Sequence, residues 1–179
     1  MPSRPGAVSR RGTHPAPASG VTTQPNPAPA AETLTTHVCP EHAVLHGLLR
    51  AVCDDVEAGR CAAARSACEA FERGLLRHFH TEEALLFPLF EARVGIVGGP
   101  TATLRQEHRE IARSAGLLRE ALDRDDTDAF QDSVRFLRAT LRQHCSKEER
   151  VLFPTTDAAL SERELQAACE RLNRPDRVN

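Results

Sequence analysis

Histidine and glutamate recur with one spacing in two stretches of the chain. HFHTEEALLFP begins at His78, HCSKEERVLFP begins at His144, and both follow the pattern H-x-x-x-E-E-x-x-L-F-P. In each stretch a glutamate, Glu82 or Glu148, comes four residues after the histidine, so the two side chains share one face of a helix. Imidazole nitrogen and carboxylate oxygen together suit iron, manganese or zinc. The repeated pattern therefore indicates a metal site.

The repeat extends to a further pair of histidines. A shift of 66 residues, with no gap, superimposes His42 on His108 as well as one stretch on the other. The two histidines of each half are centred on residue 60 or on residue 126, where turns are expected. Residues equidistant from the turn of a helical hairpin lie side by side. Two such hairpins would gather four histidines and two glutamates, and shared carboxylates suggest a bridged dinuclear centre.

The positions of Glu82 and Glu148 among apolar residues support this interpretation. An ionised glutamate is almost never buried without a partner. A single histidine on such a face is more often a core residue satisfied by hydrogen bonds, and a single glutamate more often lies on the surface. Histidines and glutamates at matching positions in both halves favour the metal site instead.

Four other glutamates adjoin these residues. Glu83 and Glu149 lie one step off the apolar stripe, so we expect them in solvent. Glu41 and Glu107 directly precede histidines of the site. They either orient a histidine through a hydrogen bond or lie on the surface.

Apolar residues recur at helical spacing through most of the chain, and no stretch alternates with the period of a strand. We expect four long helices, over residues of about 40–58, 61–89, 101–124 and 127–154. Pro40 suits a first helical turn, whereas Pro88 and Pro154 should bend or end their helices. A capping box at Ser161 opens a short helix to about Leu172. The expected fold class is all-α, an up-down-up-down four-helix bundle with a short fifth C-terminal helix.

Composition sets further bounds. Residues 1–36 are rich in Pro, Ala, Ser and Thr and are expected to be a disordered tail, whereas residues 37–174 form the bundle. Charged residues make up 27% of the chain and leave a net charge of -2, so nucleic acid is not an expected partner. With no apolar run near the ~20 residues of a membrane span and no signal peptide, we expect a cytoplasmic protein with no membrane partner. The six cysteines form no CxxC pair and are expected to be reduced.

Two cysteines need separate consideration. Cys145 takes the place of Phe79 in the repeat, and it is either a small buried filler or a thiol close enough to a metal to react with an oxidant or nitric oxide. Cys39 lies between His37 and His42, which resembles a zinc cluster. Three ligands within six residues seldom enclose an ion, so we do not expect a site there.

These residues resemble the hemerythrin-like, or HHE cation-binding, family, and the resemblance runs from about Glu41 to Leu172. It implies a four-helix bundle with a non-haem di-iron centre, in which histidines from all four helices hold two Fe ions. In that family two carboxylates and an oxo or hydroxo group bridge the irons. Carried onto this chain, the resemblance implies four terminal ligands and two bridges: His42, His78, His108 and His144, with Glu82 and Glu148.

A fifth histidine distinguishes the oxygen carriers of the family, one turn after the ligand on the third helix. Here that position is Ala112, whereas the equivalent place in the first half is His46, four residues after His42. We therefore expect His42, His46 and His78 to bind one iron. The histidines of the second half would bind the other iron and leave it a free position. The alternative is a four-histidine site in which His46 is a core residue.

The resemblance implies binding of O2 or related small oxidants, for storage, delivery or sensing. Ferritin-like sites use mostly carboxylates, whereas these donors are mostly neutral imidazoles, which stabilise ferric iron less and suit reversible uptake of O2, peroxide or nitric oxide (NO). The alternative is a di-iron enzyme acting on peroxide or nitric oxide, or an iron donor for iron-sulfur repair. Apolar residues after the glutamates should keep water out: Leu85, Leu86, Phe87, Leu152 and Phe153.

Overall fold

Helices are the only regular secondary structure in residues 32–174, which are the residues that the computed structural model describes. The all-α prediction is confirmed for this part of the chain. Residues 1–31 of the expected disordered tail lie outside the described residues, whereas residues 34–36, also expected in that tail, belong to the first helix. The α-helices are α1 (Leu34–Glu57), α2 (Cys61–Thr81), α3 (Phe87–Val94), α4 (Pro100–Asp123), α5 (Thr127–Lys147), α6 (Phe153–Ala159) and α7 (Glu162–Leu172). Two π-helical turns, η1 (Glu82–Leu86) and η2 (Glu148–Leu152), join α2 to α3 and α5 to α6.

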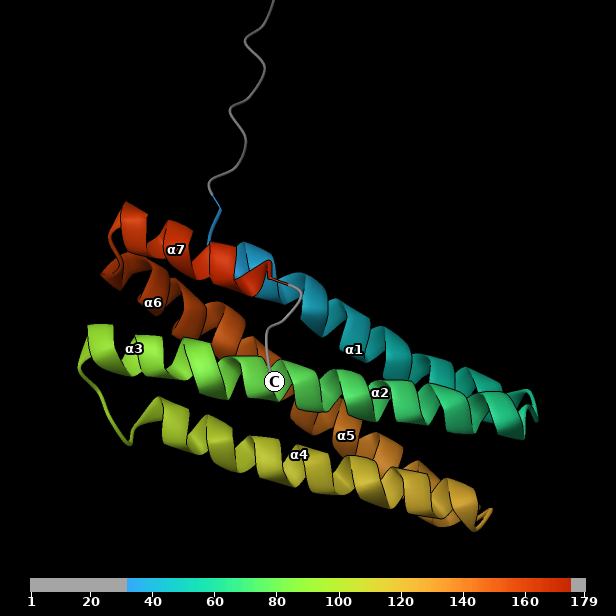
Figure 1. Cartoon of the computed structure of the whole chain (residues 1–179). Helices are drawn as coiled ribbons and strands as arrows, with labels where there is room; N and C mark the ends of the chain where they lie inside the picture. The colour runs from blue at the N-terminus through green and yellow to red at the C-terminus, as the bar shows by residue number, and fades with distance from the viewer. Residues whose placement is uncertain (1–31, 175–179) are drawn as a thin grey trace, which may run out of the picture. The chain divides into compact units, whose positions relative to one another are not determined.

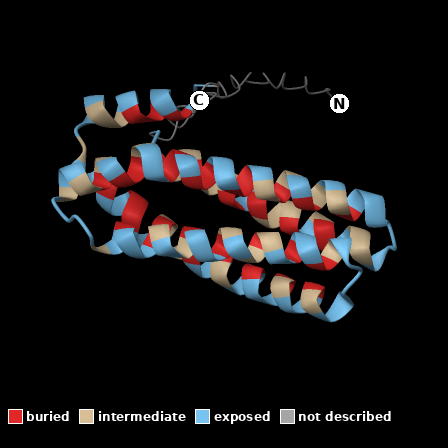
Figure 2. Cartoon of the chain, turned by 60° about the horizontal axis from the view of Figure 1, so that its bottom comes forward, coloured by how far each residue is buried: buried red, intermediate tan, exposed pale blue. Residues whose placement is uncertain are grey.

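Four long helical rods lie alongside one another (Figure 1). They are α1, α2 continuing into α3, α4, and α5 continuing into α6, while α7 lies beside the start of α1. The rods bury their inner faces and expose their outer faces (Figure 2). No helix among the described residues combines the length and the apolar character that crossing a membrane would require.

Equivalent turns close the two helical hairpins. Gly59, after α1, has φ of +68°, and Asp125, after α4, has φ of +53°. These positions are 66 residues apart, so the repeat includes the turns. Glycine adopts this left-handed conformation without strain, and aspartate is among the side chains that tolerate it best. Asp126 then caps α5 by accepting a hydrogen bond from the Ala129 N–H at 3.0 Å.

The first helix begins earlier than predicted. Thr33 caps α1 by accepting a hydrogen bond from the Thr36 N–H at 3.1 Å, and the Asp157 carboxylate accepts one from the Leu34 N–H at 2.9 Å. Pro40 consequently lies inside the helix and not in its first turn. Thr36 and Pro40 are both exposed, so water can solvate the carbonyl that the missing proline N–H leaves without a helical partner.

Neither Pro88 nor Pro154 ends the helical rod, although the preceding α-helix gives way to a π-helical turn before each proline. In η1 the Phe87 N–H bonds to the Glu82 carbonyl, five residues back, and η2 repeats this geometry. This π-helical turn ends the backbone hydrogen bonds of one α-helix, and those of the next α-helix begin after it. Each proline then lies in the first turn of a new α-helix, where its N–H is not needed.

Two apolar clusters fill the interior. The turn-end cluster lies toward the Gly59 and Asp125 turns and includes Leu45, Leu49, Phe71, Leu75, Ile111, Leu118, Leu137 and Leu141. The loop-end cluster lies toward α3, α6 and α7 and includes Leu34, Val38, Leu86, Phe87, Leu104, Phe153, Ala168, Cys169 and Leu172. The buried histidines and glutamates lie where the two clusters meet along the rods.

Candidate metal centre

Six polar side chains are buried between the two apolar clusters, each at most 3% exposed. They are His42, His78, Glu82, His108, His144 and Glu148. As the repeat predicts, the histidines of each half meet across their hairpin. The ring centroids of His42 and His78 are 4.9 Å apart, and those of His108 and His144 are 4.7 Å apart.

The Glu82 carboxylate faces histidines of both halves. Its Oε1 lies 3.2 Å from Nε2 of His78 and 4.0 Å from Nε2 of His42. Its Oε2 lies 3.2 Å from Nε2 of His108. Oε1 therefore faces the two histidines of the first half, and Oε2 faces a histidine of the second half.

The Glu148 carboxylate has the equivalent arrangement. Its Oε2 lies 3.4 Å from Nε2 of His42, and its Oε1 lies 3.2 Å from Nε2 of His144. Two donor groups result, and in each group the donor atoms lie within 4.8 Å of one another. The groups are His42, His78, Glu82 and Glu148, and Glu82, His108, His144 and Glu148. Because both carboxylates belong to both groups, the arrangement could hold two ions bridged by Glu82 and Glu148.

Two glutamates expected in solvent instead contact the histidines. Oε1 of Glu83 lies 2.7 Å from Nδ1 of His108, and Oε1 of Glu149 lies 2.7 Å from Nδ1 of His42. Their side chains are 42% and 37% exposed, so each carboxylate has water on one side and an imidazole on the other. The expected exposure is thus confirmed in part, but the contacts with the histidines were not predicted, because helical phase locates the Cβ atom and these side chains are long enough to reach a neighbouring helix.

Glu41 and Glu107 also orient histidines, which resolves the alternative left open by their spacing. Each contacts the histidine of the neighbouring helix and not the one that it precedes. Oε2 of Glu41 lies 3.1 Å from Nδ1 of His78, and Oε2 of Glu107 lies 3.0 Å from Nδ1 of His144. Glu107 additionally forms an ion pair with Lys147. All four imidazoles therefore have a carboxylate at Nδ1, the usual arrangement for histidines that bind metal through Nε2.

The inner donor atoms lack hydrogen-bond partners within the described part of the chain. Both oxygens of Glu82 and of Glu148 are unsatisfied, and so are the Nε2 atoms of His42 and His78. Nε2 of His108 and Nε2 of His144 face each other at 3.1 Å. When Nδ1 of each ring donates to its carboxylate, both Nε2 atoms carry lone pairs and repel. Buried polar atoms are rarely left in this condition, and bound cations would satisfy them together. The donor set therefore fits metal ions.

The pKa shifts within the cluster also favour bound cations. Burial alone would raise the pKa of Glu82, but the neighbouring His78, His108 and His42 outweigh it and hold that pKa well below its usual range. Burial alone would lower the pKa of His42, yet the nearby Cys145 and the two buried carboxylates raise it far above its usual value. The buried carboxylates thus require positive charge beside them. Metal ions would supply that charge while the imidazoles stay neutral.

The surroundings of the two donor groups differ at one pair of positions. Phenylalanines lie over one histidine in each half: the pairs are Phe87 with His108 and Phe153 with His42. Phe79 also stacks on His108, with ring centroids 3.8 Å apart and an interplanar angle of 11°. The equivalent residue, Cys145, is buried against His42, and burial raises the pKa of its thiol. The donor group that contains His42 is therefore lined by a smaller side chain at this position than the group that contains His108.

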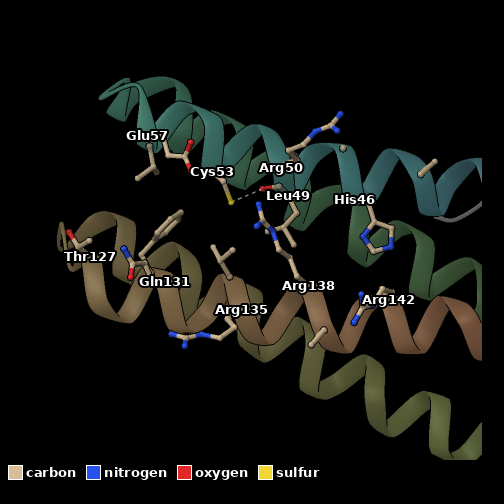
Figure 3. Close-up of a pocket in the computed structure, with 16 residues that line it drawn as sticks. His46, Leu49, Arg50, Cys53, Glu57, Thr127, Gln131, Arg135, Arg138 and Arg142 are labelled. Carbon is tan, nitrogen blue, oxygen red and sulfur yellow. Dashed lines mark hydrogen bonds between the residues drawn. The ribbon is translucent and has the colours of Figure 1, made fainter.

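The structure does not bring His46 into either donor group. Its half-buried side chain points from α1 toward α5 over a groove of about 1130 Å³, where Arg142 lies on the facing helix (Figure 3). Burial lowers the pKa of His46, and the charges of His42 and Arg142 add to this effect. Four residues turn a helix about 40° beyond a full circle. That rotation directs His46 to the groove and His42 to the centre.

The structure also locates the remaining residues that the sequence singled out. The apolar residues that follow the buried glutamates are themselves buried or half-buried, namely Leu85, Leu86, Phe87, Leu152 and Phe153. All six cysteines are free thiols, as expected. His37 and Cys39 do not form a donor group with His42, which faces the centre. The π-helical turns were not predicted; the available signal was a proline six residues after each buried glutamate.

Comparison with known proteins gives one result. A family model described as the hemerythrin HHE cation-binding domain matches residues 33–156, a range that contains all six buried donors. No curated protein matches the chain, and no solved structure matches it.

Proposed function

The chain belongs to the hemerythrin HHE cation-binding family, and from this premise we propose that it holds two iron ions and binds O2 or a related small oxidant. The observation that carries the proposal is the sharing of Glu82 and Glu148 by two buried donor groups. We propose the up-down-up-down four-helix bundle of the family as the framework, because each of the four helical rods contributes donors.

Each iron would receive two histidine nitrogens and one oxygen from each bridging carboxylate. His42 and His78 would bind one ion, and His108 and His144 the other. The fifth-ligand role expected for His46 is left out of this set, because the side chain faces the groove between α1 and α5. Four protein donors per ion leave room for a small exogenous ligand.

The surroundings favour a ligand that is small and uncharged. Leu86, Phe87, Leu152 and Phe153 are at most 2% exposed and shield the donors from bulk water. The irons would supply reversible electron donation to O2. The protein would hold the imidazoles in one tautomer through the carboxylates at Nδ1 and limit the entry of water and protons.

The test is to expose anaerobic ferrous protein to O2 and to follow the visible spectrum. We expect a new absorption band that disappears when O2 is removed under vacuum. Rapid O2 evolution from added peroxide would instead identify the enzymatic alternative. Protein that folds with no metal at the six buried donors, or with a single zinc and no iron bound to them, would disprove the di-iron assignment.

The outer carboxylates should tune metal affinity. Glu83→Gln keeps the size of the side chain but weakens the acceptor at Nδ1 of His108. We expect the affinity for ferrous iron, measured by competition with a chelator, to fall by about 10-fold to 100-fold. The matched control is Glu69→Gln on α2, an exposed glutamate that pairs with Arg73, and its affinity should equal that of the wild type. Equal affinity in both variants would contradict the orienting role.

Removal of His46 should leave the iron content unchanged, because its side chain lies outside both donor groups. We expect His46→Ala to retain both irons per chain and the azide spectrum of the oxidised protein. His78→Ala, which removes a donor from the same hairpin, should lose at least one iron. Loss of iron from His46→Ala would show instead that His46 is an iron ligand.

A further inference from the structure

A separate cluster of metal-binding side chains lies where the start of α1 meets α7. Glu32 precedes α1, His37 lies in its first turns, and Cys169 lies on α7. A carboxylate oxygen, an imidazole nitrogen and the sulfur of these residues all lie within 4.8 Å of one another. We propose that this cluster binds one Zn²⁺ ion or a similar divalent transition-metal ion. The site shares no residue with the proposed iron centre and does not depend on its function.

The imidazole of His37 is oriented in the manner typical of a metal ligand. Its Nδ1 lies 3.0 Å from the Thr33 carbonyl oxygen, an acceptor, so Nδ1 carries the proton. Nε2 therefore carries the lone pair, as in histidines that bind zinc through one nitrogen while the other donates to the protein. The side-chain amide nitrogen of Asn173 lies 3.2 Å from Nε2 and donates a hydrogen bond to it, which a bound cation would displace. The amide oxygen of Asn173 could serve as a fourth ligand after rotation of the amide, or water could take that position.

Cys169 supplies the sulfur from the apolar interior. The residue is 0% exposed within the loop-end cluster, and burial, followed by the charges of Glu32 and Asp157, raises the pKa of its thiol. A cation among these groups would reverse that effect, and the thiol would release its proton to solvent on binding. The two carboxylates that now disfavour a thiolate would then attract the cation.

The donor set favours zinc over harder cations. Thiolate and imidazole ligands suit zinc, whereas magnesium and calcium prefer oxygen ligands alone. The three donors come from residues 32, 37 and 169, so one ion would join the start of α1 to α7 near the end of the described chain. A bound ion should consequently hold α7 against α1 and raise the melting temperature.

Cobalt is the probe that tests the site, because a cobalt–thiolate bond gives a near-ultraviolet charge-transfer band. The full-length protein is first loaded with ferrous iron under anaerobic conditions, which fills the proposed iron centre, and is then titrated with Co²⁺. We expect one cobalt per chain, the charge-transfer band, and displacement of cobalt by Zn²⁺. In Cys169→Ser the band should disappear and the Co²⁺ affinity should fall by at least about 100-fold.

Matched variants test two of the other thiols. Cys145→Ser removes the thiol beside the proposed iron centre, and Cys39→Ser removes the one nearest His37 in sequence; both should keep the band. Should Cys169→Ser fail to fold, His37→Gln tests the same site at a half-buried position and should weaken Co²⁺ binding by at least about 10-fold. Absence of the band in the wild type, its persistence in Cys169→Ser, or unchanged affinity in His37→Gln would overturn the proposal.

Discussion

Replacing both buried carboxylates, with Glu82→Gln and Glu148→Gln in one chain, should abolish binding of the iron pair. The two carboxylates carry the only side-chain oxygens in the two donor groups among the described residues, and each faces histidines from both halves. Glutamine keeps the shape but removes the negative charge that draws cations into the interior. The loss of two shared ligands should lower the affinity for ferrous iron by more than about 1000-fold.

Iron content and thermal unfolding measure this effect independently. Wild-type protein at a ferrous iron concentration of about 100 times Kd should gain about 2.7 kcal/mol in the free energy of unfolding for each ion bound, whereas the double variant should gain none. The control is Glu110→Gln on α4, whose exposed side chain accepts a hydrogen bond from Gln106. A double variant that keeps both irons would contradict the assignment of the bridges.

The internal repeat is what made the centre predictable. Periodicity shows only that a residue faces the interior, which for one histidine has several explanations. A shift of 66 residues that preserves His42, His78 and Glu82 as a set identifies residues that act together. Turn positions then determine which residues lie side by side, and the 4.9 Å separation of the His42 and His78 rings agrees with that geometry.

Features that depend on side-chain reach were not predictable in this way. Glu83 and Glu149 were expected in solvent from helical phase, yet each carboxylate extends to a histidine on another helix. His46 shares a helix face with His42 only approximately, and the difference in direction is enough to place it over the groove. Both outcomes depend on the distance to a neighbouring helix, which a single helical pattern does not contain.

Backbone departures from the regular α-helix were missed for a related reason. A proline was expected to bend or end its helix, but one π-helical turn before Pro88, and another before Pro154, lets the rod continue. The turn begins at the buried glutamate in both halves. Such turns are frequent at functional sites, so their repetition here supports the centre proposed from the side chains.

Enlarging Cys145 should restrict access of small ligands to the iron between His42 and His78. Phe79 covers His108 in the second donor group, whereas the smaller Cys145 occupies the equivalent place in the first. We therefore expect exogenous ligands to bind the iron held by His42 and His78. The sequence had instead suggested a free position on the iron held by His108 and His144. Cys145→Leu should weaken azide binding to the oxidised protein by at least about 10-fold, an effect of about 1.4 kcal/mol, with both irons retained.

A larger side chain can also act by overpacking the core. Added methylene groups lower the free energy of unfolding by about 1–3 kcal/mol in any well-packed core, so this effect needs a control. Cys53→Leu supplies the control: Cys53 is 6% exposed in the same turn-end cluster, eleven residues beyond His42 along α1. Both variants should lose similar stability, but only Cys145→Leu should lose azide affinity. Equal azide affinity in the two variants would show that the size of residue 145 does not control access, and the asymmetry between Cys145 and Phe79 would then be a matter of packing alone.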